Sequence, residues 1–279
     1  MIRQIDHIVI LVKELEQAIA DYTALGFTVV RGGDHPGGAT HNALVIFEDG
    51  AYFELIAFKQ PAEEHHWWRK GARVGEGLLD YALLPGAIAE DIAAARARGL
   101  ALEGPNPGGR WRPDGVQVAW QIGRGGTPDL PFLCCDVTPR ALRVPEGAVR
   151  RHANGAAGVA AITVAVANLE QSIERYHALL GAAAQEERAE DPAGDGLRKA
   201  RFRLGTAVIT LAQPVSTGNG QAGALRRYLE AGGEGPFVVA LRAAHETATG
   251  PLDARLTHGA QLEFGVTDPV PVAGYESVP

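Results

Sequence analysis

The sequence predicts an α+β fold built from repeated units, each with one strand, one helix and three further strands. Over residues 4–58, apolar residues are spaced first as in a strand, then as in an amphipathic helix, and then as in three strands broken by glycines. Residues 78–137 repeat this order. A third unit repeats the helix in letters, because "LEQ" at 15–17 with Tyr22 matches "LEQ" at 169–171 with Tyr176.

The first unit opens with "QIDHIVILV" at residues 4–12, an apolar, β-branched run that predicts a buried strand. The next run, "KELEQAIADYTALG", has apolar residues at helical spacing and predicts a helix that ends at Gly26. Three glycine-bounded strands follow: "FTVVRGG", "THNALVIFEDG" and "AYFELIAF".

The second unit has the same elements in the same order: the strand "LLDYALLPG", the Ala-rich helix "AIAEDIAAARARG", and the strands "LALEGP", "GVQVAWQIG" and "LPFLCCDV". The third unit contains "GVAAITVAVANLEQSIERYHALLG", "ARFRLG" and "AVITLAQP", and "GPFVVALRA" with "AQLEFGV" indicates a reduced fourth unit. Four units in two pairs are the most economical interpretation.

A domain boundary is expected in "TPRALRVPEGAVRRHANGAAG", which is rich in Pro, Gly and Arg and has little periodicity. The alternative is a long ordered surface loop inside one domain. We predict one domain over residues 1–140 and a second over residues 155–268. At 279 residues the chain is long enough for about two domains.

Composition narrows the class of protein. A net charge of −7 without any basic block argues against a nucleic-acid partner. The only two cysteines, Cys134 and Cys135, are neighbours that point to opposite faces of a strand, so we expect neither a disulfide framework nor a thiolate metal cluster. No apolar run approaches the roughly 20 residues of a membrane span, and the N-terminus lacks a signal-peptide pattern. We expect a cytoplasmic protein with no membrane partner.

Two polar residues interrupt strands that are otherwise apolar. His7 shares a face with Val9 in the first strand, and Glu54 shares a face with Tyr52 in the fourth. A buried polar group without a partner costs about 1–3 kcal/mol. Together, an imidazole and a carboxylate can bind a cation or form a charge-assisted hydrogen bond, and both readings stay open from the residues alone.

The runs "IDHIVILV", "HPGGATHNALVIF" and "AYFELIAF" resemble the glyoxalase-like domain of the vicinal oxygen chelate superfamily, as do "RWRPDGVQVAWQ" and "LPFLCCD" in the second unit. The resemblance covers about the first half of the chain, and the second half resembles the family only through the repeated helix. It implies modules of one strand, one helix and three strands, paired into two open, cup-shaped mixed sheets. It also implies a divalent metal ion on the cup floor, held by a His on a first strand and a Glu on a last strand.

The resemblance implies His7 and Glu54 as metal ligands, and we predict His41 as the third, because two histidines and a carboxylate form a common divalent set. The alternative for His41 is a residue at the start of a strand that binds substrate or backbone. His35 lies in a Gly-rich turn and is expected to be a loop residue. The adjacent residues of "HHWW" at 65–68 point in different directions, so this run is expected to be an exposed or lid segment.

We predict that Asn42, Tyr52, Arg112 and Trp120 bind the substrate. An arginine beside an aromatic wall suits an anionic or planar, carbonyl-bearing ligand. The alternative is a turn pair of Arg112 with Asp114 and a core position for Trp120.

The second unit departs from the family pattern at the two expected ligand positions. Asp80 or Tyr81 occupies the position of the first-strand His, and Leu133 or Cys134 occupies the position of the last-strand Glu. Alignment of the two repeated helices places Ala161 opposite His7. The same alignment places Thr210 opposite Glu54, so no metal is expected in the second domain, which would support, dimerise or shape the first.

The predicted function is that of a metal-dependent small-molecule lyase, isomerase or dioxygenase acting on a carbonyl or vicinal-oxygen substrate. Glu54 would act in it as ligand or as proton shuttle. The alternative is a metal-free protein that binds or sequesters a small molecule, as bleomycin-resistance proteins do. The expected partners are the small-molecule substrate and, in a homodimer, a second copy of the chain.

Overall fold

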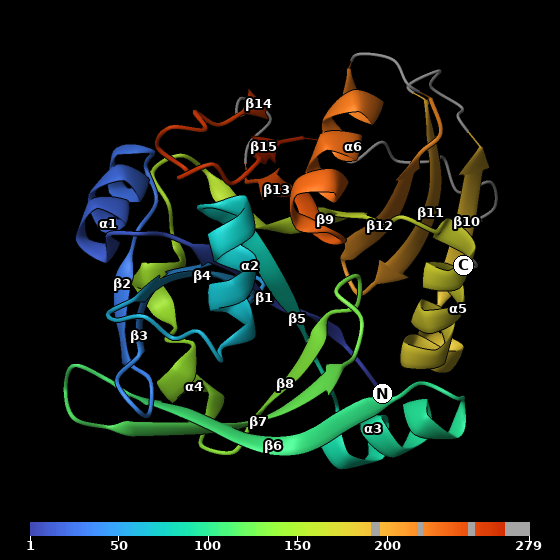
Figure 1. Ribbon diagram of the computed structural model, residues 1–279. Coiled ribbons are helices and arrows are strands. Elements are labelled where there is room, and N and C mark those ends of the chain that lie inside the picture. Colours follow the sequence, from blue (N-terminus) through green and yellow to red (C-terminus); the bar gives the residue numbers. More distant parts are fainter. Residues whose placement is uncertain (191–195, 217–219, 245–248, 266–279) are drawn as a thin grey trace, which may run out of the picture.

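The strands of the computed structural model form two sheets, the first from residues 4–136 and the second from residues 156–264 (Figure 1). The structure describes residues 1–190, 196–216, 220–244 and 249–265. Of the predicted second domain, the last residues, 266–268, lie outside this described part.

The first sheet is a closed barrel in the order β1-β4-β3-β2-β6-β7-β8-β5. Its strands are β1 (Gln4–Leu11), β2 (Val30–Asp34), β3 (Thr40–Ile46), β4 (Tyr52–Phe58), β5 (Gly77–Leu84), β6 (Leu102–Trp111), β7 (Gln117–Gly125) and β8 (Phe132–Asp136). Its helices are α1 (Leu15–Ala24), α2 (His66–Val74) and α3 (Ile88–Ala97). The two units meet where β1 runs antiparallel to β5. The opposite edges, β2 and β6, are joined at the single pair Asp34 and Trp111, which closes the predicted open sheet.

The second sheet has the order β10-β11-β12-β9-β13-β15-β14. Its strands are β9 (Ala156–Ala165), β10 (Gln185–Glu190), β11 (Leu197–Leu204), β12 (Ala207–Pro214), β13 (Gly235–Ala243), β14 (Gly250–Pro251) and β15 (Leu262–Phe264). Its helices are α5 (Leu169–Leu180), the 3₁₀ helix η2 (Gly181–Ala183) and α6 (Gln221–Gly232). Within the described residues the fourth unit consists of three strands, two of them short. The predicted α+β fold with paired, repeated units is confirmed.

Strand alternation separates an inner face from an outer face. Val9 of β1 packs inside the barrel with Ile56 of β4, whereas Ile8 and Ile10 belong to the core beneath the helices. In the second unit the same rule places Cys134 inside, with Asp80 opposite Val9 in the strand register. The position of His7 and Glu54 on the inner face therefore follows from the two-residue period of a strand.

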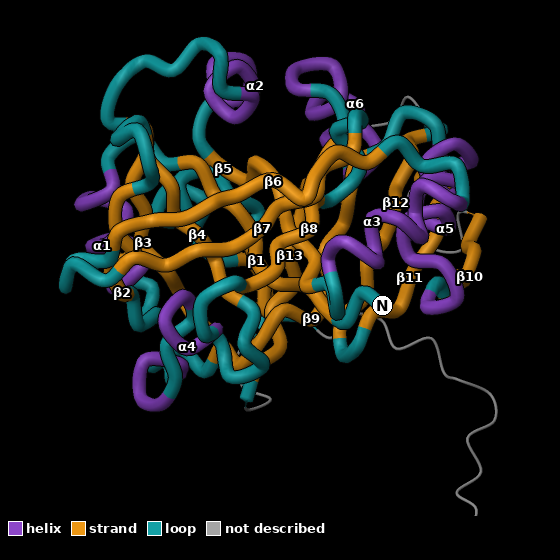
Figure 2. The backbone as a smooth tube through the Cα atoms, turned by 90° about the horizontal axis from the view of Figure 1, so that it is seen from below, coloured by secondary structure: helices purple, strands orange, loops and turns teal. Residues whose placement is uncertain are grey.

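The two sheets share one hydrophobic core. A single cluster of buried residues contains Tyr81 and Leu83 of β5 as well as Ile162 of β9 and Tyr176 of α5. The Tyr81 and Tyr176 hydroxyls are hydrogen-bonded to each other across the junction. Figure 2 shows α2 and α6 on one side of the two sheets and α4 (Arg140–Arg143) on the other.

The segment predicted as the domain boundary connects the sheets as an ordered stretch. It contains α4 and the 3₁₀ helix η1 (Gly147–Arg150). Arg143 of α4 is only 1% exposed, so part of this segment belongs to the base of the barrel. None of the described helices is both long enough and apolar enough to cross a membrane.

Candidate active site

The inner face of the barrel contains a cavity of about 360 Å³. The lining comes from both units of the barrel, from the segment that contains α2 and, through Arg143, from α4. The residues are His7, His35, Pro36, Ala39, Thr40, Tyr52, Glu54, Ile56, His65, His66, Trp67, Pro107, Gly108, Gly109, Arg110, Trp120, Ile122, Arg124, Phe132, Cys134 and Arg143. A concave, largely aromatic site with a few converging polar groups is the usual form of a small-molecule site.

Glu54 lies at the centre of the polar groups. It is 6% exposed, and its Oε1 accepts a hydrogen bond of 2.6 Å from Asn42 Nδ2 of β3. His7 Nε2 lies 3.5 Å from Glu54 Oε2, and His35 Nε2 lies 3.6 Å from Glu54 Oε1. The carboxylate therefore stands between two imidazoles, one facing each oxygen.

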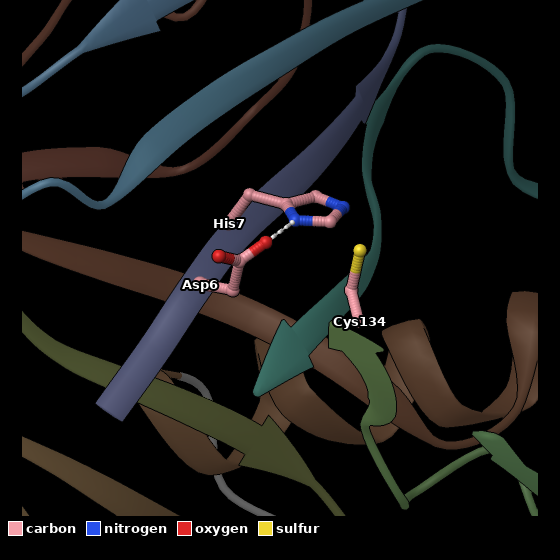
Figure 3. A group of neighbouring side chains, drawn as sticks. All are labelled: Asp6, His7 and Cys134. Atoms are coloured by element: carbon pink, nitrogen blue, oxygen red, sulfur yellow. Dashed lines mark hydrogen bonds and ion pairs between the residues drawn. The ribbon is translucent and has the colours of Figure 1, made fainter. Parts of the chain in front are cut away.

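His7 is fixed by Asp6, the residue before it. A register shift between Ile5 and His7 in the β1–β5 ladder interrupts the strand there, and a bulge of this kind lets two neighbouring side chains interact. The Asp6 carboxylate can only accept, so His7 Nδ1 donates to its Oδ2 at 2.7 Å (Figure 3). The ring stacks on Tyr52 with centroids 4.7 Å apart. The Nε2 atom, with its lone pair in the neutral ring, is thereby directed at Glu54.

Asp6 is itself held by two arginines of α4. Arg143 donates to both Asp6 oxygens, at 2.7 and 3.1 Å, and Arg140 donates to Oδ1 at 2.6 Å. Burial alone would raise the pKa of Asp6, but Arg143, the bond with His7, and Arg140 outweigh burial and hold that pKa well below its ordinary value. Arg143 also donates to the Tyr52 hydroxyl at 2.7 Å. The support of His7 thus comes from the segment between the two sheets.

Asp6, His7 and Cys134 form a group whose potential ligand atoms lie within 4.8 Å of one another (Figure 3). Its donor set suits a cation poorly. The Asp6 oxygens already bind two guanidinium groups, and burial raises the pKa of the Cys134 thiol, which keeps it protonated. We therefore interpret this group as the support of His7.

His35 approaches Glu54 from the turn between β2 and β3. Its Nδ1 is hydrogen-bonded to Thr40 Oγ1 at 2.9 Å, and its ring lies edge-on to Trp120 at 6.0 Å. Burial lowers the pKa of His35, although the Glu54 charge acts in the opposite direction, so the ring stays neutral at pH 7. A neutral imidazole is the form that binds a metal ion.

A second polar group closes the cavity on the side of α2. Asp80 accepts hydrogen bonds of 2.8 Å from Trp67 Nε1 and from Arg124. The Arg124 guanidinium lies 4.5 Å from the centre of the Phe132 ring. Burial, and then the charge of Arg124, lowers the pKa of His66 to about 3, so this lining residue is neutral at pH 7. The "HHWW" run, expected to be exposed or a lid, contributes three residues to the wall.

Arg110 is a buried cation without a carboxylate partner among the described residues. It is 3% exposed, and it donates to the backbone oxygens of Gly32 and Arg143 at 3.0 and 2.9 Å. Its Nη1 has no hydrogen bond within the described part of the chain. Because Arg110 lines the cavity, this nitrogen can bind an anionic group of a ligand.

The predicted positions of His41 and Arg112 at the cavity are wrong. His41 lies on the outer face of β3, since its neighbour Asn42 points inward, and the charges acting on it are those of Lys59, Asp34, Glu16 and Arg31. Arg112 lies beyond the end of β6, where it pairs with Asp114 at 2.7 Å and donates to Leu142 O. Tyr52 and Trp120 line the cavity, and Asn42 holds Glu54 without being part of the lining.

The sequence reasoning missed several residues of this site. The "DH" pair at 6–7 is the one signal that could have indicated Asp6 as a partner of His7. Strand alternation could not have separated Arg110 from Arg112, because residues two apart share a face; the difference is that β6 ends at Trp111, between them. Arg143 could not have been found, because it lies in a segment without periodicity.

Comparisons with known proteins agree with this architecture. A family model described as a glyoxalase-like domain matches residues 5–180. A crystal structure of a hypothetical protein from Staphylococcus aureus is similar with a TM-score of 0.69 and 14% identity, over 94% of this chain and 98% of that chain. A mutant of 4-hydroxymandelate synthase from Streptomyces coelicolor is similar with a TM-score of 0.61 and 16% identity, over 87% of this chain and 72% of that chain. These structural similarities concern the fold. Curated proteins gave no match.

Proposed function

The chain belongs to the glyoxalase-like domain family of the vicinal oxygen chelate superfamily, and on that premise we propose that it is a metal-dependent enzyme acting on a small anionic substrate with a carbonyl group or vicinal oxygens. The observation that carries this proposal is the convergence of His7 Nε2 and His35 Nε2 on the two oxygens of Glu54. A lyase, an isomerase and a dioxygenase are the reaction types that this arrangement supports.

The donor set fits a divalent cation in residue type. At 3.5 Å, His7 Nε2 and Glu54 Oε2 are too far apart for a good hydrogen bond, and two ligands about 2.1 Å from one ion lie about 3.0–3.4 Å apart. His7 faces Glu54 Oε2 and His35 faces Glu54 Oε1, so each imidazole lies beside a different oxygen of the carboxylate. Two histidines and one carboxylate leave positions open for substrate oxygens.

The hydrogen bonds around His7, His35 and Glu54 also favour a site for a divalent cation. Asp6 holds His7 by Nδ1, and Thr40 holds His35 by Nδ1, which leaves both Nε2 atoms directed at Glu54. Ligating histidines commonly use their second nitrogen in this way, to fix the ring and its tautomer. Asn42 fixes the carboxylate itself.

A bound divalent ion would act as a Lewis acid that polarises a carbonyl group or binds two neighbouring oxygens. The residues of the chain supply the remaining parts. Arg110 Nη1 anchors the negative charge of the substrate, and the rings of Trp120 and Phe132 enclose its apolar part. Among the described residues that line the cavity, Glu54 is the one carboxylate, and its Oε2 has no hydrogen bond of normal length. This oxygen would either bind the ion or, where it does not, accept a proton from the substrate.

One observation favours a metal-free binding protein as the second candidate. The short bond from Asn42 already satisfies Glu54 Oε1, and the aromatic lining would suit a planar ligand without any ion. In that case Glu54 would have a structural role or hold a donor group of the ligand.

The two candidates differ in metal binding. We would purify the full chain, remove metal with a chelator, reload it separately with Fe²⁺, Mn²⁺, Co²⁺, Ni²⁺ and Zn²⁺, and measure bound metal by mass spectrometry. About one equivalent is expected for the wild type and for Cys134→Ala, and a loss of binding is expected for His7→Ala and Glu54→Ala. If no ion binds the wild type, or if His7→Ala and Glu54→Ala bind as well as the wild type, the metal-free binding protein is favoured instead.

A further inference from the structure

The second sheet has a cavity of its own, of about 250 Å³. We call it the second cavity. Its lining comes from the inner faces of six strands and from α6: Ala161, Thr163, Glu187, Leu197, Lys199, Arg201, Arg203, Val208, Thr210, Gln221, Leu225, Phe237, Val238, Ala240, Glu263 and Gly265. The proposed function does not use any of these residues.

The strand register relates this cavity to the first one. In the barrel, His7 pairs with Tyr52, and Glu54 follows two residues later on the same face. In the second sheet, Ala161 pairs with Val208 in the same parallel arrangement, and Thr210 follows two residues later. The positions of His7 and Glu54 are therefore occupied by a methyl group and a hydroxyl group. The second cavity therefore lies at the strand positions that are equivalent to those of the first cavity, but its side chains at these positions are not metal ligands.

A row of side chains crosses the floor of the second cavity. Arg201 of β11 pairs with Thr210 of β12, which pairs with Thr163 of β9, and neighbours across strands lie on the same face about 5 Å apart. All three are partly buried. Within the described part of the chain, neither the Arg201 guanidinium nor the two hydroxyls makes a hydrogen bond or an ion pair. Hydrogen-bond donors that have no protein partner and that converge on one cavity form a site for an anion.

The charges around this row leave Arg201 available. Arg203 lies 3.5 Å from Glu187 and is therefore balanced in part by that carboxylate. Lys199 adds a further positive charge on β11, and Glu263 adds a negative one on β15. Among these lining residues, Arg201 is the cation whose guanidinium makes no hydrogen bond or ion pair within the described part of the chain, which favours a ligand with a negative charge.

The second cavity also has an apolar part. Leu197, Leu225 and Phe237 line it and pack against one another in one cluster. The cavity is smaller than most drug-sized sites, so its ligand is small. We infer that the second cavity binds a small monocarboxylate whose carboxylate lies against Arg201 and the two threonines and whose apolar body lies against Leu225 and Phe237.

The test uses the full chain and phenylacetate, with phenylacetamide as its neutral analogue and inorganic phosphate as a second anion. Binding is measured by isothermal titration calorimetry. Phenylacetate is expected to bind saturably, the amide and phosphate at least about tenfold more weakly. Arg201→Gln is expected to weaken phenylacetate binding about tenfold or more, and Thr210→Val severalfold, because each removes donors to a charged group. Arg227→Gln is the matched control, since Arg227 is exposed on α6 and should leave binding unchanged.

Tryptophan fluorescence distinguishes the two cavities. The four tryptophans all lie in the first 120 residues, and Trp67 and Trp120 line the first cavity. Binding in the second cavity should therefore leave their emission unchanged and should persist in Arg110→Gln. The inference is overturned if the wild type does not bind phenylacetate, or if folded Arg201→Gln and Thr210→Val, checked by circular dichroism, both bind it like the wild type. It is equally overturned if binding disappears in Arg110→Gln.

Discussion

His35 and His41 show how one residue of strand register decides which histidine reaches the site. Both are near β3, but His41 is inside the strand and has the opposite parity to Asn42, so its ring is outside the barrel. His35 lies in the turn before the strand, where alternation does not apply, and the backbone directs it at Glu54. Beside Glu54 the structure therefore places His7 and His35 rather than His7 and the predicted His41.

Metal binding by single variants tests whether His35 rather than His41 is the second histidine ligand. His35→Ala is expected to weaken divalent metal binding by about tenfold or more, because it removes a proposed ligand, whereas His41→Ala should leave it unchanged. Bound metal is measured by competition with a fluorescent chelator. Equal affinities for the two variants would contradict the assignment of His35.

Arg143 and Arg112 differ in burial and therefore in what they contribute to stability. Arg143 is 1% exposed and binds Asp6 and Asp136, whereas the pair of Arg112 with Asp114 lies at the surface. Replacement of Arg143 leaves Asp6 buried without its main partner. Loss of one partner of a buried ion pair costs about 3–5 kcal/mol, and a surface pair is worth about 0–1 kcal/mol.

We therefore expect Arg143→Met to lower the free energy of unfolding by about 3–5 kcal/mol and Arg112→Met by less than about 1 kcal/mol. Urea denaturation followed by circular dichroism measures both. A loss of less than about 1 kcal/mol for Arg143→Met would show that the arginine cluster does not support the barrel.

Among the elements, α2 is one that the strand-helix-strands pattern did not predict, as are α4 and α6. It packs on β5 and α6, and it is tied to the barrel by Trp67, which donates to Asp80 (Figure 1). Lys70 of α2 also donates to Glu234 O, next to the second sheet. The helix is thus attached by a few polar bonds and by the packing of Trp67 on the inner cluster of the barrel, and none of its residues is fully buried.

Asp80 makes this attachment sensitive to acid. Burial alone would raise the pKa of Asp80, but the charge of Arg124 and the bonds from Arg124 and Trp67 lower it below its ordinary value. A carboxyl whose pKa is lower in the native than in the unfolded chain, where it is about 3.9, contributes stability above that pH. The contribution is lost as the pH falls through the native pKa.

We expect Asp80→Asn to lower the free energy of unfolding by about 1.5–3 kcal/mol at pH 7, since a charged hydrogen-bond acceptor is lost. Below about pH 4 the difference between variant and wild type should shrink, because Asp80 becomes protonated first in the unfolded chain and, at lower pH, in the native protein. Urea denaturation at pH 7, 4 and 3 measures this. A difference that stays constant with pH would contradict the role of the charge.

At the scale of the whole molecule, the two sheets share one hydrophobic core. The buried cluster that contains Tyr81 and Tyr176 runs through both, and Arg175 of α5 binds Asp129 of the first half at 2.7 Å. Arg242 of β13 likewise binds Asp49, which lies just before β4. Separation of the halves would expose apolar surface and leave several polar groups without partners.

A single cooperative unfolding transition is therefore expected for the full chain, and a fragment of residues 1–154 should lack a cooperative transition. Differential scanning calorimetry compares the two, with the ratio of calorimetric to van't Hoff enthalpy as the criterion. Two separate transitions in the full chain, or a cooperative fragment, would show that each sheet is stable by itself.

The sequence by itself determined the repeated units, the order of their elements and the inner position of His7 and Glu54. These depend on local periods of 2 and 3.6 residues, which neighbouring residues fix without reference to the rest of the chain. Only the tertiary structure decided that β2 and β6 close the barrel, that Arg143 supports His7 through Asp6, and that His35 replaces His41 beside Glu54. Those contacts join segments that are far apart in the chain or lie in turns and bulges, where no period constrains the direction of a side chain.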